Sequence, residues 1–439
     1  MNNKLCFPVI VVPGITATYL RDEYEMPPET VWAMLRKSYD RVSLHPDNLL
    51  YEAKEPARVV TDQVIDLGYK QIVHELRHNL RDKADEPVPV FCFGYDWRQP
   101  LDMVEKQLDA FITEVIDRTK LLPHYHATHY PDDPKVHLVG HSMGGLIITG
   151  YLERKKREAR VAKVATLATP FRGSFEAVLQ VTTGTASLGT QAPSSSAREM
   201  ARAAPAVYHL IPRFEGMEFD AGLPDTLFDP AIWQPSVVRT LGEYVRLYAA
   251  EQPVDEAVIK QKASDLFSGM LAEAKKHRDR IEAFRLDQAG LTPQDWLCVV
   301  GVGSKTRVAL KIRKTSSGPE FDLASTERKD NWGSNKTKAW HLTGDGTVPF
   351  KGAQPAFLKP ENLVCVTPKD YGYWEVQDNV IANIAGFHGI MPNMNMLHRL
   401  IVRHFTGRED KHGNTWGRRA PGVGKRNWKP PMELEEKKK

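Results

Sequence analysis

The segment that decides the fold is KVHLVGHSMGGLIITGYLER, residues 135–154. Residues 136–139 form a short apolar run that predicts a buried strand, and the apolar and small residues over 146–151 predict the buried face of a helix. Between them, GHSMG at residues 140–144 fits the pattern G-x-S-x-G, in which small residues around the serine permit a sharp strand-to-helix turn. The pattern predicts that Ser142 is a nucleophile held above the edge of a sheet. A plain glycine turn is the alternative.

Similar apolar runs recur along the chain and alternate with longer amphipathic segments. Residues 101–122 are of the second kind, because Val104, Leu108 and Ile112 repeat at helical spacing between two of the runs. Strand, crossover helix and strand in this order are typical of a mostly parallel sheet flanked by helices, so we predict the α/β class. The predicted strands are PVIVVPG (8–14), VPVFCFGYDW (88–97), KVHLVGHS (135–142), VAKVATLATP (161–170), DWLCVVGVGS (295–304) and ENLVCVTP (361–368).

The pattern changes between residues 171 and 290, where a stretch rich in Thr, Ser, Gly and Ala is followed by helical sequence without a convincing strand. We interpret residues 171–290 as a mainly helical cap inserted into one α/β core, whose two parts are residues 1–170 and 291–406. The tail, residues 407–439, is basic and rich in glycine and proline. Its composition predicts a loosely packed extension.

Composition and charge limit the partners and the compartment. The 439-residue chain has 41% apolar and 26% charged residues and a net charge of only +4, which is ordinary for a folded enzyme and predicts no nucleic-acid partner. The sequence shows neither a membrane-spanning apolar segment nor an N-terminal signal peptide. We therefore expect a protein that is cytoplasmic or exported by a route without such a signal. The four cysteines, Cys6, Cys92, Cys298 and Cys365, lie in apolar runs, so a disulfide framework is not expected.

The predicted nucleophile needs two partners, because a serine hydroxyl is a weak nucleophile without a histidine base and an acid that orients it. In this type of turn the acid and then the base follow the serine along the chain. HLTGDGTVPF offers Asp345 between two glycines, and NIAGFHGIMPN offers His388 in a glycine-flanked loop. We predict these as acid and base, with an Asp-Gly turn without catalysis as the alternative for the first. His398 and His404 lie on a predicted C-terminal helix and are expected to be structural or solvent-facing.

Attack on an ester carbonyl creates an oxyanion, which needs preorganised N–H donors. One predicted donor is the backbone N–H of Met143, immediately after the serine. The other is the N–H of Ile15, which follows Pro13 and Gly14 at the end of the first predicted strand. An ordinary strand-ending turn is the alternative for this second position.

Five motifs occur in order along residues 7–405: VVPGITATYL, GYDWRQPL, GHSMGG, MARAAPAVYHLIP, and GDGTVP followed by GFHG. Together they resemble the lecithin:cholesterol acyltransferase family. The resemblance implies an α/β-hydrolase fold with a helical cap, and it implies the same triad and oxyanion donors as above. It also places the YDWR segment beside the core, where Trp97 is a candidate for lining an acyl channel.

These features predict a serine ester hydrolase for lipids or other apolar acyl esters, that is, a lipase, phospholipase or esterase that works through an acyl-enzyme. The cap favours such substrates because it can close over an acyl chain and exclude water. Transient contact with a membrane surface is expected. Three alternatives stay open: an acyltransferase that passes the acyl group to an alcohol, an antibacterial lipase effector toxin with an immunity protein as partner, and a non-catalytic binding module.

A second cluster, PHYHATHYPDD at residues 123–133, holds His124, His126 and His129 in one loop and could bind a divalent ion. The predicted reaction has no need of a metal, because the triad supplies both nucleophile and base. Prolines near both ends of the segment favour a solvated surface loop. We therefore predict no metal and no cofactor.

Overall fold

The computed structural model describes residues 6–24, 26–33, 59–184, 194–248, 255–323, 340–372, 375 and 386–437. At its centre lies a six-stranded sheet in the order β14-β9-β7-β6-β1-β5, and every neighbouring pair is parallel. All six strands fall within the six predicted apolar runs, which confirms the α/β class. The strands are β1 (Val9–Val12), β5 (Val90–Cys92), β6 (Val136–His141), β7 (Val161–Leu167), β9 (Trp296–Gly301) and β14 (Val364–Val366).

Alternating side chains give the central sheet two buried faces. In β1, Ile10 and Val12 pack into the larger hydrophobic core, whereas Val9 and Val11 pack into the smaller one on the other face. Strand β9 alternates in the same way. A parallel strand that is covered on both faces is apolar at most positions, which is why these strands are nearly continuous apolar runs in the sequence.

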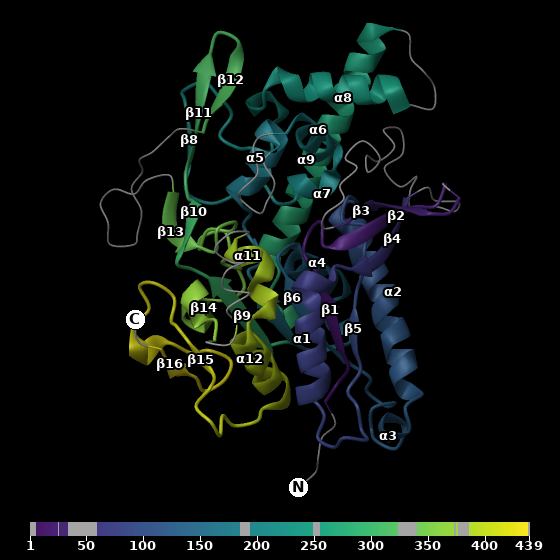
Figure 1. The fold of residues 1–439 in the computed structure, drawn as a ribbon. Coiled ribbons are helices and arrows are strands. Elements are labelled where there is room, and N and C mark those ends of the chain that lie inside the picture. Colours follow the sequence, from purple (N-terminus) through teal and green to yellow (C-terminus); the bar gives the residue numbers. More distant parts are fainter. Residues whose placement is uncertain are drawn as a thin grey trace.

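Helices cover both faces (Figure 1). Helices α2 (Leu101–Lys120) and α4 (Met143–Lys155) pack in the larger core, and α1 (Asp66–Asn79) and α12 (Asn395–Thr406) pack in the smaller one. The predicted helix over 101–122 corresponds to α2. Within the described ranges, no helix is both long and apolar enough to cross a membrane.

The helices of the predicted insertion gather in the upper part of Figure 1, and the longest of them, the 28-residue α9, reaches back to α4. The described part of residues 171–290 also contains a short strand, β8 (Met217–Phe219), which pairs with β11 and was not expected from the sequence. Three residues are too few to show strand periodicity, so only the distant partner reveals this strand. The helices are α5 (Phe175–Thr183), α6 (Ser195–Ala203), α7 (Pro205–Tyr208), α8 (Pro235–Tyr248) and α9 (Glu256–Ala283).

Smaller sheets stand around the central one, in the orders β3-β2-β4, β12-β11-β8, β10-β13 and β15-β16. Most of their strands are short and partly exposed, so they lack the long apolar runs of the central strands. Their bounds are β2 (Thr18–Asp22), β3 (Glu29–Trp32), β4 (Val59–Val64), β10 (Ser304–Arg307), β11 (Leu310–Thr315), β12 (Gly318–Asp322), β13 (Trp340–Gly344), β15 (Trp416–Gly417) and β16 (Glu435–Glu436). Two further short helices are α3 (Pro123–His126) and α11 (Phe387–Ile390).

The C-terminal tail, residues 407–437, makes more specific contacts than its composition suggests. The buried Asp370 carboxylate forms ion pairs with Arg418 and with Lys437, the second at 3.3 Å, and it accepts a hydrogen bond from the Trp416 indole at 3.1 Å. Burial alone would raise the pKa of Asp370. The hydrogen bonds from its partners and the charge of Arg418 outweigh burial, so the pKa of Asp370 lies below its ordinary value. The tail is therefore tied to the core by a buried charge.

Candidate active site

Ser142 lies in a strained turn between β6 and α4. Its backbone angles are φ 51° and ψ −126°, which residues other than glycine seldom adopt, and the residue is only 7% exposed. Neighbouring glycines make the turn possible, because a Cβ on Gly144 would lie 2.1 Å from the Val12 carbonyl oxygen. A Cβ on Gly140 would lie 2.8 Å from the Gly145 nitrogen. The turn holds the serine at the carboxyl end of the central sheet.

His388 and Asp345 reach Ser142 from two other segments. His388 lies in α11, and Asp345 follows β13 directly. His388 Nδ1 is 2.7 Å from Asp345 Oδ2, and His388 Nε2 is 2.9 Å from Ser142 Oγ. Because a carboxylate only accepts hydrogen bonds, Nδ1 carries the ring proton and Nε2 accepts from the serine hydroxyl. The structure thus brings together the three residues that the sequence singled out as nucleophile, acid and base.

Backbone groups fix the Asp345 carboxylate in place. Its Oδ1 accepts from the N–H of Thr347 at 2.9 Å and of Val348 at 2.7 Å. Its own carbonyl accepts from the His388 N–H at 3.1 Å. The tight turn that allows these contacts passes through Gly346 at φ 98°, a conformation that glycine adopts without steric strain.

The two histidines of α12 are structural. The Nε2 atom of His398 is 2.6 Å from the Pro392 carbonyl, and that of His404 is 3.1 Å from the Val164 carbonyl. Both residues are 2% exposed, and burial lowers the pKa of His398 to about 4 and of His404 to about 3. Both rings are therefore neutral near pH 7 and engaged with backbone away from Ser142.

The two predicted oxyanion donors come from the start of α4 and from the turn after β1. Met143 begins α4 directly after the serine. Gly14, which precedes Ile15, packs against the nucleophile: a Cβ on Gly14 would lie 3.0 Å from Ser142 Cβ. The Gly14 N–H donates to Tyr69 Oη at 2.9 Å, whereas the Ile15 N–H has no hydrogen-bond partner among the described residues. The role of the Ile15 N–H as an oxyanion donor stays a prediction.

Trp97 is fully buried and held by packing. Its indole N–H donates to the Thr18 carbonyl at 3.2 Å, and its ring lies 4.7 Å from that of Trp32. On either side of it in the chain, Asp96 and Arg98 form an ion pair at 2.8 Å. These contacts fit a structural role for the YDWR segment. That Trp97 lines an acyl channel stays a prediction.

The loop histidines at residues 123–133 have separate partners. His124 Nε2 is 2.9 Å from the Pro87 carbonyl, and the fully exposed His129 is 3.5 Å from Asp132. Within the described part of the chain, these histidines do not form a group of three ligand atoms close enough to hold a metal.

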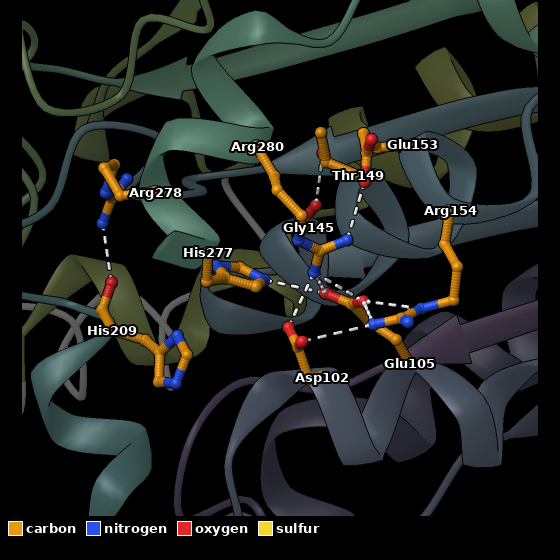
Figure 2. A network of polar contacts seen from close by, with 10 residues as sticks. All are labelled: Asp102, Glu105, Gly145, Thr149, Glu153, Arg154, His209, His277, Arg278 and Arg280. Atoms are coloured by element: carbon orange, nitrogen blue, oxygen red, sulfur yellow. Dashed lines mark hydrogen bonds and ion pairs between the residues drawn. The ribbon is translucent and has the colours of Figure 1, made fainter. Parts of the chain in front are cut away.

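A buried network of charges joins α9 to α2 and α4 (Figure 2). At its centre the fully buried Glu105 carboxylate lies 2.7 Å from His277 Nε2 and 2.9 Å from the Arg280 guanidinium. Arg154 adds a second guanidinium at 2.9 Å. The ligand atoms of Asp102, Glu105 and His277 all lie within 4.8 Å of one another, but the two arginines already neutralise the carboxylates. Ion pairing between helices therefore accounts for this cluster.

Glu176 is a buried carboxyl near the site that the sequence did not single out. It lies in the first turn of α5 and is 6% exposed, and its backbone N–H donates to Ser174 Oγ, whose hydroxyl donates to the Thr347 carbonyl. Burial raises the pKa of Glu176 to about 7, although the charge of Arg307 opposes the rise. The N-cap serine predicts a helix start, but nothing local in the sequence predicts the burial of the acid after it.

A parallel sheet whose central strand leads through a strained serine turn into a helix defines the α/β-hydrolase class. Within this class, the chain belongs to the lecithin:cholesterol acyltransferase family, whose family model matches residues 62–354.

Solved structures are similar as well. A chain of the Tle4–Tli4 complex matches with a TM-score of 0.57 and 15% identity, over 91% of this chain and 98% of that chain. Phospholipase PlaB from Legionella pneumophila matches with a TM-score of 0.24 and 13% identity, over 46% of this chain and 36% of that chain. No curated protein sequence gives a significant match. The first of these likenesses agrees with the fold described above.

Proposed function

We propose that the protein is a serine ester hydrolase for lipids or other apolar acyl esters, with Ser142 as nucleophile, His388 as base and Asp345 as acid. The observation that carries the proposal is the hydrogen-bond series from the Ser142 hydroxyl through the His388 ring to the Asp345 carboxylate. Membership of the lecithin:cholesterol acyltransferase family supports chemistry on lipid acyl esters.

The first half-reaction forms an acyl-enzyme. As Ser142 Oγ attacks the ester carbonyl carbon, His388 Nε2 takes the hydroxyl proton. The carbonyl oxygen becomes an oxyanion and accepts from the N–H groups of Ile15 and Met143; losing one such donor typically costs about 3 kcal/mol. The imidazolium then gives its proton to the departing alcohol, and the acyl group stays on the serine. Asp345 holds the ring tautomer and stabilises the imidazolium.

The second half-reaction decides between hydrolysis and acyl transfer. His388 takes a proton from the acceptor, the acceptor oxygen attacks the acyl carbon, and Ser142 leaves with its proton restored. Water as acceptor gives a carboxylic acid, and an alcohol gives a new ester. Hydrolysis is the proposed main reaction because water is always available, and a helical cap over residues 171–290 favours long apolar acyl chains.

The test combines covalent labelling with an ester panel. A fluorophosphonate should label the wild type and not Ser142→Ala, and His388→Ala and Asp345→Ala should lower kcat at least about a thousandfold while the fold is kept. His398→Ala is the control for a buried histidine outside the site. Equal labelling of wild type and Ser142→Ala would refute the nucleophile, and loss in His398→Ala with retention in His388→Ala would refute the base.

The same panel addresses the substrate and the acceptor. Nitrophenyl esters from short to long chain report the acyl preference, and phospholipids with products resolved by mass report the position of cleavage. Addition of an alcohol separates the two outcomes, because an acyltransferase would yield the new ester in place of the free acid. A folded protein that is neither labelled nor active would support the binding-module alternative.

We further propose that the chain binds a partner protein, which would be an immunity protein if the chain is a lipase effector toxin. The observation in favour is that the solved structure similar over 91% of this chain is a complex, Tle4–Tli4. The test is co-expression with the product of a neighbouring gene that encodes a signal peptide, followed by co-purification and assay. Binding with inhibition of the esterase supports the proposal, and no binding to such a product refutes it.

A further inference from the structure

Two buried side chains, Tyr69 and His141, bridge the turn that carries Ile15 and the backbone of His388. Tyr69 comes from α1, His141 precedes Ser142 in β6, and each is 4% exposed. We propose that they form a positioning relay. This is a chain of hydrogen bonds that fixes the turn carrying Ile15, called the oxyanion turn below, and the base His388 relative to the nucleophile. This role rests on the proposed serine hydrolase function.

Three hydrogen bonds make up the relay. The Gly14 nitrogen is 2.9 Å from Tyr69 Oη, and Tyr69 Oη is 2.6 Å from His141 Nδ1. On the far side of the ring, His141 Nε2 is 3.0 Å from the His388 carbonyl oxygen. The rings also pack together, with centroids 5.7 Å apart for Tyr69 and His141 and 5.1 Å apart for the two histidines. The relay is thus continuous from one segment to the other.

In one arrangement of hydrogens, all three contacts are hydrogen bonds and the Tyr69 hydroxyl acts as a donor. The Gly14 N–H can only donate, so Tyr69 Oη accepts from it; a carbonyl oxygen can only accept, so His141 Nε2 carries a hydrogen. The Tyr69 hydroxyl then donates to His141 Nδ1, which must be unprotonated. Burial lowers the pKa of His141 to about 3, and burial raises the pKa of Tyr69 above its ordinary value. Both groups therefore keep these protonation states at neutral pH.

At the oxyanion turn, the relay engages Gly14 and leaves the next N–H for the ligand. The Gly14 carbonyl accepts from the Ala17 N–H at 3.4 Å. In a trans peptide the C=O and the following N–H point in opposite directions, so the Ile15 N–H is directed away from Ala17. A Cβ on Gly14 would lie 3.0 Å from Ser142 Cβ and 3.6 Å from His141 Nδ1, so the turn packs directly on the nucleophile and the relay.

At the base, the relay and Asp345 both restrain the His388 backbone. The His388 carbonyl accepts from His141, and its N–H donates to the Asp345 carbonyl at 3.1 Å. Helix α11 has only four residues and cannot fix the ring by itself. Because a displacement of about 1 Å can cost about a hundredfold in rate, we expect the relay to act on kcat and not on substrate binding.

Tyr69→Phe removes one hydroxyl and breaks the first two bonds of the relay. We expect kcat for nitrophenyl esters and the rate of fluorophosphonate labelling to fall about 10- to 100-fold, with KM unchanged. The matched control is Tyr125→Phe in α3, which removes the hydroxyl of another buried tyrosine. That hydroxyl donates to the Cys6 carbonyl at 2.6 Å, before strand β1 begins. The control should lower the melting temperature and leave the labelling rate unchanged, with all rates measured where both variants are folded.

His141 allows a test by conservative rescue. Glutamine carries an acceptor and a donor on one amide, so His141→Gln can meet both partners and should keep kcat within about threefold. His141→Phe keeps a ring but removes both nitrogens and should lose about as much as Tyr69→Phe. Because the two residues act in one chain, the double variant Tyr69→Phe/His141→Phe should lose no more than the worse single variant.

The outcomes separate this inference from the proposed function. The relay would be refuted if Tyr69→Phe were labelled as fast as Tyr125→Phe. It would also be refuted if the losses in kcat of the two single variants multiplied in the double variant. Neither result would contradict the proposed hydrolase function. Equal labelling of wild type and Ser142→Ala would instead refute the nucleophile on which the relay depends.

Discussion

Replacement of Glu176 by glutamine should stabilise the folded protein at pH 8 and leave its stability almost unchanged at pH 4. Burial raises the pKa of this carboxyl from the ordinary value of 4.5 to about 7, although the charge of Arg307 opposes the rise. Between these two values the folded protein holds a proton that the unfolded chain has released, so the free energy of unfolding falls as the pH rises. Glutamine has nearly the same shape and does not ionise, so it removes this dependence.

The magnitude follows from the two pKa values. Each pH unit between them corresponds to about 1.4 kcal/mol. By pH 8 the Glu176 carboxyl is ionised in both states, and the wild type has lost about 3 kcal/mol; at pH 6 the loss is about 2 kcal/mol. The effect is large against a total stability of about 5–15 kcal/mol.

Urea unfolding of the wild type and of Glu176→Gln at about pH 4, 6 and 8 measures the difference directly. The control is Glu199→Gln on α6, which changes an exposed carboxylate and should follow the wild type at every pH. If Glu176→Gln also follows the wild type at all three pH values, ionisation of the buried Glu176 carboxyl has no cost, and the reasoning from burial is wrong.

Three further substitutions test the serine turn, the buried charge network and the C-terminal tail. Gly144→Ala would place a Cβ 2.1 Å from the Val12 carbonyl oxygen, so we expect loss of fluorophosphonate labelling and a lower melting temperature; full labelling would contradict the turn geometry. Gly150→Ala would place a Cβ 1.8 Å from Glu105 Oε1, which should break the buried network and cost about 3 kcal/mol in urea unfolding. Asp370→Asn should release the C-terminal tail to limited proteolysis. The wild-type tail should be released only as the pH falls below the ordinary carboxyl pKa of 3.8, because the folded pKa is lowered.

The central sheet could be predicted because its signals are local. A strand covered on both faces is apolar at most positions, and Val9–Val12 is apolar at all four. The serine turn is local too, because the glycines around Ser142 avoid clashes within the same few residues. Chain order then identified Asp345 and His388 as partners, although the serine and the histidine are 246 residues apart.

The remaining features depend on contacts between distant segments. Strand β8 has three residues and gains its partner only from β11, so no periodicity predicts it. Tyr69 meets His141 across 72 residues, and from sequence it is indistinguishable from any apolar position on a helix. An acidic residue in the first turn of a helix, such as Glu176, is common, and it is the tertiary fold that buries this one. Asp370 likewise meets its arginine partner from the tail 48 residues later.

The buried network of Figure 2 limits how the predicted cap can open. Glu105 is fully buried, and its partners come from α9, through His277 and Arg280, and from α4, through Arg154. Lifting α9 from the core would strip the carboxylate of its α9 partners, and breaking a buried ion pair by removing one partner typically costs about 3–5 kcal/mol. We therefore expect helix α9 to stay with the core. Between α7 and β8, His209 is also bound to α9, because its carbonyl oxygen accepts a hydrogen bond from Arg278 at 2.6 Å and its ring lies 4.8 Å from that of His277 (Figure 2).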